Sequence, residues 1–229
     1  MTAFDDERAR DALLSSGSRF LAHAADWLAH HDDPVALLLV LTKETGPALG
    51  PWATYRWCAV LGLAQVGAVR ALARDILDEE PDHPLVAVDA AFAKAHAACV
   101  ETESALSHRD VVVSFLARTD HDDVASARLA LAHTERAGAE GPTHPARALV
   151  DDVRARLAGA RAPSIAGPAL EAALLAPKGS RDEALVDAAR LALGRAQGDD
   201  GLVVVGPRAR ENRFATLRAL ALHTRLARE

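Results

Sequence analysis

The sequence predicts an all-α protein of stacked antiparallel helical hairpins, arranged either as a bundle or as a short α-solenoid of about ten to twelve helices. Signals for helix starts and helix ends recur along the 229 residues. Half of the residues are hydrophobic, yet only 4% are aromatic, and Ala supplies much of the apolar share. Because Ala favours helices and lets them approach closely, we expect many thin, tightly packed helices.

The N-terminal part of the chain is expected to be helical over residues 5–30, with a break near Gly17. Its large apolar side chains recur at the spacing of one helix face. They are Phe20, Ala24, Trp27 and Leu28. This stripe predicts that one side of the segment packs on the core.

The opposite face of the same segment carries His23, Asp26 and His30. Imidazole and carboxylate groups at this spacing can share a metal ion. Because the three side chains lie opposite the apolar stripe, we favour a solvated polar face and expect no bound metal.

Asp33 and Pro34 signal the next helix start, with Asp as N-cap and Pro in the first helical position. The helix expected over 35–45 is apolar on all sides through Leu41. A helix of this kind is typical of the centre of a fold. Gly46 is its expected C-cap.

Proline and glycine residues divide the middle of the chain into further helices. One begins at Pro51 and ends near Gly67. The others are expected over 68–79, 85–103, 109–118, 122–137 and 145–158. The β-branched run at 111–113 also fits a strand, but we favour a helix because no partner strand is nearby.

A connector rich in Pro, Ala and Gly over 160–168 is the best internal boundary. It divides the chain into a main helical domain, 1–160, and C-terminal helices with a basic arm, 161–229; the alternative is one continuous domain. Helices are expected over 169–175, from a capping box at 180–183 to near Gly198, and over 212–228.

The run from 202 to 205, Leu-Val-Val-Val, is the best strand candidate. One strand alone cannot pair, so the sequence predicts an extended arm or a strand added to another chain.

An internal duplication is a further hypothesis. The triplet His-Asp-Asp at 31–33 recurs at 121–123, and each copy opens a helix. The similarity extends over 31–51 and 121–142 with the register kept within one residue. Duplicated helical hairpins commonly build such folds, but we favour coincidence in a chain rich in Ala, Leu and Asp as the explanation of the match.

The composition excludes several classes of protein. A formal net charge of −6 opposes a general nucleic-acid binder, which carries a basic surface. The longest apolar run is too short to cross a bilayer, and the first ten residues do not resemble a secretion signal. We therefore expect a cytoplasmic protein with no membrane or nucleic-acid partner.

Two residue types carry further information. The 23 Arg against 3 Lys indicate a GC-rich, bacterial genome rather than special chemistry. Cys58 and Cys99 lie in apolar helical surroundings, which favours two buried free thiols over a disulfide or a redox pair.

No common catalytic signature is present. The chain lacks a P-loop, a dinucleotide-binding glycine motif, a nucleophile elbow and zinc-type cysteine pairs. The leading hypothesis is therefore a non-catalytic interaction or adaptor protein with no cofactor, although the absence of these motifs leaves an unusual enzyme open.

The alternative hypothesis is a small-molecule-binding protein or an unusual enzyme with a pocket inside a helical bundle. Aromatic side chains gather near one arginine in the first 57 residues, and an Asp and a His border the apolar stripe of the helix at 85–103. The candidate ligand-binding residues are Trp52, Tyr55, Arg56, Asp89 and His96. Core packing explains the same aromatic residues.

The strongest charge signal lies at 206–229, which carries six Arg against two Glu, a net charge of +4. The remaining chain has 20 basic and 30 acidic residues, a net charge of −10. This asymmetry fits either a helix docked on the acidic body or a contact for an acidic partner protein or a second copy of the chain. The candidate partner-binding residues are Arg210, Arg213, Arg218 and Arg225.

Overall fold

The all-α prediction is confirmed for the part of the chain that the structure describes. This computed structural model describes residues 3–31, 34–44, 54, 57–63, 66–69, 71, 145–159, 162–175 and 181–228. Within these ranges the regular elements are helices, and no strand occurs. The longer helices are α1 (Asp6–Leu14), α2 (Arg19–His30), α3 (Pro34–Glu44), α9 (Pro145–Arg156), α10 (Ala162–Leu175), α11 (Glu183–Ala196) and α12 (Ala209–Arg228), and residues 57–60 and 67–69 are also helical.

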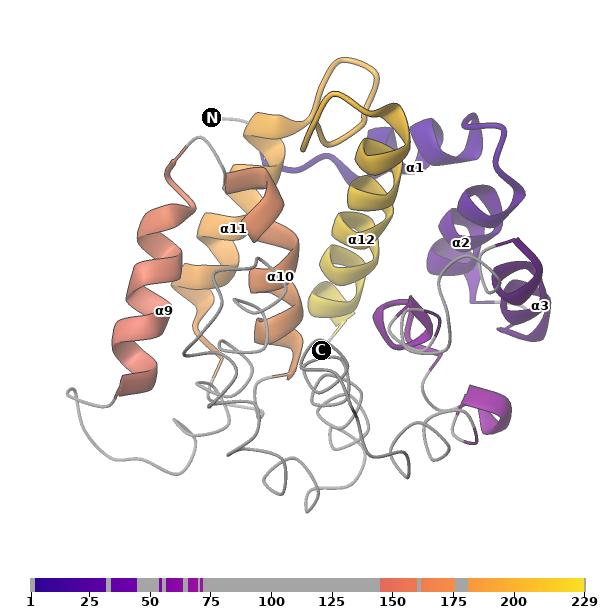
Figure 1. Ribbon diagram of the computed structural model, residues 1–229, viewed down its shortest axis with the longest axis horizontal. Coiled ribbons are helices and arrows are strands. Elements are labelled where there is room, and N and C mark those ends of the chain that lie inside the picture. Colours follow the sequence, from indigo (N-terminus) through magenta and orange to yellow (C-terminus); the bar gives the residue numbers. More distant parts are fainter. Residues whose placement is uncertain are drawn as a thin grey trace, which may run out of the picture.

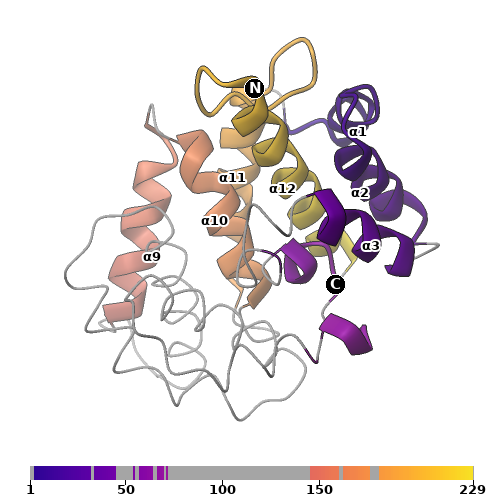
Figure 2. The same cartoon turned by 45° about the vertical axis from the view of Figure 1, so that its right-hand side comes forward.

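The last helix, α12, lies between two groups of helices (Figure 1). It packs on α10 on one side and on α1 and α2 on the other. Helix α11 packs on α10, α9 packs on both, and α3 packs on α2 (Figure 2). The helices from both ends of the sequence therefore share one core, with α12 at its centre.

The break expected near Gly17 is confirmed. Gly17 has a φ of 74°, a left-handed conformation that favours glycine, and it separates α1 from α2. The side chain of Ser18 then accepts a hydrogen bond from the backbone N–H of Leu21 and caps α2. Phe20 and Leu28 on the expected apolar stripe are buried.

Helix α3 begins at Pro34 as expected, but it is not buried on all sides. Leu37 and Leu41 are buried, whereas Val35 and Leu39 are 57% and 53% exposed. The expectation of a central helix is therefore wrong. The physical reason is position, since α3 lies at the edge of the described helices and packs mainly on α2 among them.

The expected connector at 160–168 is also wrong, because α10 runs through most of it. Pro168 lies inside this helix, where it lacks an N–H to donate. Burial compensates for this loss, since Ile165, Leu170 and their neighbours pack against α11 and α12. Tertiary packing thus overrides the local signal, and the division at residue 160 stays a prediction.

The helix starts in the C-terminal part differ from the sequence expectations. Asp182 is the N-cap of α11, because its side chain accepts from the backbone N–H of Leu185. The helix therefore begins two residues later than the capping box at 180–183 predicts, and Glu183 is its first residue. Helix α12 begins at Ala209, three residues before the expected Asn212.

The run at 202–205 forms neither an arm nor a strand for another chain. Val203 is fully buried and makes an isolated antiparallel bridge with Gln197. Its N–H donates to the hydroxyl oxygen of Thr216 in α12 at 2.8 Å. The segment therefore folds back on its own chain because Val203 fills the core above α12.

The second copy of the suspected duplication, 121–142, lies outside the described residues, as do the helices expected over 85–103, 109–118 and 122–137. Within the described ranges, no helix combines the length and apolar character that crossing a bilayer requires.

Candidate functional site

The arginines of α12 divide into two groups along the helix. Arg210 and Arg213 lie near its N-terminal end, whereas Arg218, Arg225 and Arg228 lie farther along it. The second group contacts other helices of the same chain. In the first group Arg210 is exposed and Arg213 is half-buried, and neither forms an ion pair with any described residue.

Arg218 pairs with a buried acid. Its Nη2 donates to Oε2 of Glu171 in α10, whose side chain is fully buried, while the Arg218 side chain is 21% exposed. Gly167, one turn before Glu171, makes room for the aliphatic part of Arg218, since a Cβ there would stand 3.3 Å from Arg218 Cδ. Among the described residues Glu171 is the one charged side chain in the core.

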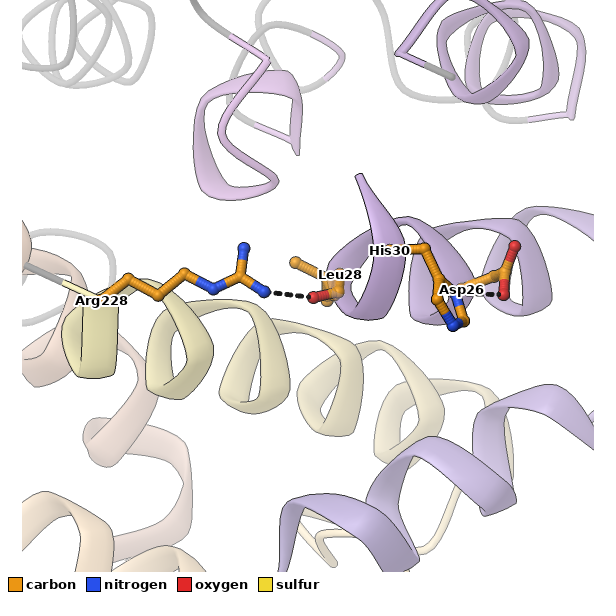
Figure 3. Close-up of polar contacts among 4 residues, drawn as sticks. All are labelled: Asp26, Leu28, His30 and Arg228. Carbon is orange, nitrogen blue, oxygen red and sulfur yellow. Dashed lines mark hydrogen bonds and ion pairs between the residues drawn. The ribbon is translucent and has the colours of Figure 1, made fainter. Parts of the chain in front are cut away.

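Arg225 and Arg228 bind the C-terminal ends of two other helices. Arg225 Nη1 donates to the carbonyl oxygens of Ala59 and Val60, at 2.5 and 3.3 Å. Arg228 Nη2 donates to the carbonyl oxygen of Leu28 in the last turn of α2, at 3.2 Å (Figure 3). The last carbonyls of a helix lack intrahelical partners and carry partial negative charge, so a guanidinium group suits them.

Three more arginines repeat this arrangement at other helix ends. Each donates to a carbonyl oxygen in the last turn of a helix or just after it. The pairs are Arg8 with Gly198 after α11, Arg181 with Ala173 in α10 and Arg195 with Leu157 after α9. Part of the arginine excess therefore has a structural use, which composition alone did not indicate.

Three arginines around the start of α12 form what we term the α12 arginine surface: Arg208 and Arg210, which are exposed, and Arg213, which is half-buried. Arg208 pairs with Glu211 at 3.1 Å, but its side chain is still 80% exposed. The guanidinium carbon of Arg210 lies 5.8 Å from the ring centre of Phe214.

Phe214 connects this surface to an aromatic cluster. Its ring stacks on Phe20 at 6.1 Å and lies 5.6 Å from Trp57, and Phe20 also meets Trp57 edge-on. These contacts hold the first half of α12 against α2 and fix the position from which Arg210 and Arg213 project.

The candidate pocket residues Trp52, Tyr55, Arg56, Asp89 and His96 lie outside the described residues. Two neighbours of this stretch are described. Thr54 is buried, and the thiol of Cys58 is fully buried. Burial raises the pKa of Cys58 to about 12, so this free thiol stays protonated and unreactive at neutral pH.

The polar face of α2 is solvated as expected. His30 Nδ1 lies 3.0 Å from Asp26 Oδ1, and both side chains are more than 60% exposed (Figure 3). No group of three or more metal-binding side chains occurs among the residues that the structure describes.

Sequence reasoning missed Glu171 and His223. Glu171 is the single acid in the apolar run at 169–175, and that isolation was a usable signal. His223 gave no signal, because its neighbours come from α1 and α11 and become adjacent only in the folded chain.

Comparison with known proteins found no matching family model, no matching curated protein and no matching solved structure.

Proposed function

We propose that this chain is a non-catalytic helical interaction protein that binds an acidic segment of a partner protein through the α12 arginine surface. The observation that carries this proposal is the position of Arg210 and Arg213. Arg210 lies in the first turn of α12, where the helix dipole already places partial positive charge, and Arg213 lies directly after that turn.

Basic side chains at this end of a helix are unfavourable by about 0.3 to 1 kcal/mol each. Arg225 and Arg228 lie in the last turn, where the dipole favours them. Arg210 in the first turn thus breaks a local rule with no ion pair to a described residue, and Arg213 adds a second positive charge in the next turn. Such exceptions are typical of functional surfaces. An anionic partner supplies the missing counter-charge.

The surface also has the residue types of a binding site. Arginine and aromatic side chains carry much of the binding energy at protein interfaces. Arg210 lies over Phe214, and Phe214 is itself held by Phe20. A preorganised arginine loses less conformational freedom on binding, so an acidic segment is the partner that this geometry favours.

The test compares two charge-reversal variants by quantitative affinity capture from the native host. Arg210→Glu/Arg213→Glu removes the proposed surface, whereas Arg19→Glu/Lys43→Glu makes the same change in net charge at other exposed positions. We expect one stoichiometric partner with the unmodified protein, a loss of about tenfold or more with the first variant, and normal recovery with the second.

Equal loss with both variants, or no partner with the unmodified protein, contradicts the proposal. Light scattering on the purified protein adds a second check. If the protein self-associates and Arg210→Glu/Arg213→Glu abolishes this, the surface binds a second copy of the chain rather than another protein. A native mass that exceeds the chain by a small molecule, with no partner captured, favours the alternative pocket at Trp52, Tyr55 and Arg56.

A further inference from the structure

His223 lies where three parts of the chain meet. It belongs to α12, its ring meets the ring of Phe4 edge-on at 5.6 Å, and charged groups act on it from Arg190 in α11 and Asp6 in α1. Its Nδ1 is buried and has no hydrogen-bond partner among the described residues. A neutral imidazole tolerates this site, because one ring nitrogen needs no proton.

Residues 3–8, which cover His223, are also joined to the segment that follows α11, through Asp5 and through the bond from Arg8 to Gly198. Phe4 is 6% exposed. Next to it, the N–H of Asp5 donates to Gln197 Oε1, and Gln197 Nε2 donates to the Asp5 carbonyl oxygen, both at 2.8 Å. Asp5 is also the N-cap of α1, where its side chain accepts from the N–H of Arg8.

We propose that His223 acts as a proton-controlled latch: the neutral ring holds residues 3–8 against α12, and protonation releases them. A protonated ring carries an N–H at both nitrogens, and the buried Nδ1–H then lacks an acceptor. It also places a positive charge near Arg190. Movement of Phe4 away from the ring opens it to water and relieves both effects.

The charged groups around the ring determine the sign of the effect. Burial lowers the pKa of His223 below its ordinary value of 6.5, and Arg190 lowers it further, whereas Asp6 opposes them. The carboxylate of Glu171 in α10 does not supply a counter-charge to a protonated His223, because it is paired with Arg218. The unfolded or opened chain therefore binds protons more readily than the closed one. The latch is fully closed above about pH 6.5 and weakens as the pH falls below it.

Amide hydrogen exchange tests the latch. We expect the protection of amides 5–9, corrected for the intrinsic effect of pH, to fall about tenfold between about pH 7.5 and about pH 5. Amides in α10 should keep their protection, because α10 packs mainly on α11 and α12 rather than on α1. His223→Gln, which keeps a neutral polar side chain, should show no such fall.

Arg190→Gln provides a second variant that leaves the imidazole in place. Without the nearby positive charge, the ring is penalised less when it takes up a proton, so the fall in protection should be smaller than in the unmodified protein. The latch is refuted by unchanged protection at low pH, by an equal fall in His223→Gln, or by an equal fall throughout α10 and α11, which indicates general unfolding.

Discussion

Arg225 near the C-terminal end of the chain donates a hydrogen bond of 2.5 Å to the carbonyl oxygen of Ala59, a residue 166 positions away. The same guanidinium group reaches the carbonyl oxygen of Val60, and its Cδ and Nε pass over Gly62. The Arg225 side chain thus caps the C-terminal end of a short helix that is distant from it in the sequence.

We predict that Arg225→Ala lowers the free energy of unfolding by about 1 to 3 kcal/mol, because it leaves carbonyl groups without a charged donor. Arg225→Lys should recover only part of the loss, since an ammonium group cannot reproduce the planar guanidinium geometry. Urea denaturation followed by circular dichroism measures both. Arg210→Ala is the control and should stay within about 0.5 kcal/mol of the unmodified protein; an equal loss there contradicts the capping role.

Gly201 and Gly17 form a matched pair that separates two effects. Both have a positive φ, of 81° and 74°. A Cβ at Gly201 would clash with the carbonyl group of Arg8, whereas a Cβ at Gly17 meets open space. We expect Gly17→Ala to cost about 1 kcal/mol, from backbone strain alone, and Gly201→Ala to cost more than about 2 kcal/mol. Thermal unfolding distinguishes them, and equal shifts in Tm speak against a close contact between Gly201 and α1.

The pair of Glu171 and Arg218 predicts strong coupling between two substitutions. Glu171→Leu leaves a half-buried guanidinium group in apolar surroundings and should cost about 2 to 4 kcal/mol, a range lowered because Arg218 is 21% exposed. The double variant Glu171→Leu/Arg218→Met should recover most of this loss, because two apolar side chains can pack together. Denaturant titrations of the two singles and the double give the coupling energy, and simple additivity would rule out a direct pair.

The sequence predicted helix boundaries best where one residue sets the backbone conformation by itself, without contacts from other helices. Gly17 and Pro34 mark their boundaries as expected, because a left-handed glycine and a first-turn proline act through the backbone. The signal at Pro168 was misleading, since burial of α10 between α11 and α12 outweighs one missing hydrogen bond.

The candidate site was predictable only as a positive helix. The charge pattern singled out the arginines of α12, but it could not indicate which of them meet other helices. Arg218 and Arg225 find their partners in α10 and near residue 60, and these partners become neighbours only after folding. Arg210 and Arg213 lie nearer the N-terminal end of α12 than Arg218 and Arg225 do. The sequence did not show this for Arg210, because it predicted a helix start at residue 212 rather than 209.

The bond between Arg228 and Leu28 joins residues 200 positions apart. At a synthesis rate of about 5 to 20 residues per second, the ribosome makes α2 on the order of 10 to 40 seconds before it makes the end of α12. During this interval α2 lacks α12, whose Phe214 later stacks on Phe20. The N-terminal helices therefore cannot complete this core until α12 has been made, and the order of synthesis delays the packing of the two ends of the fold.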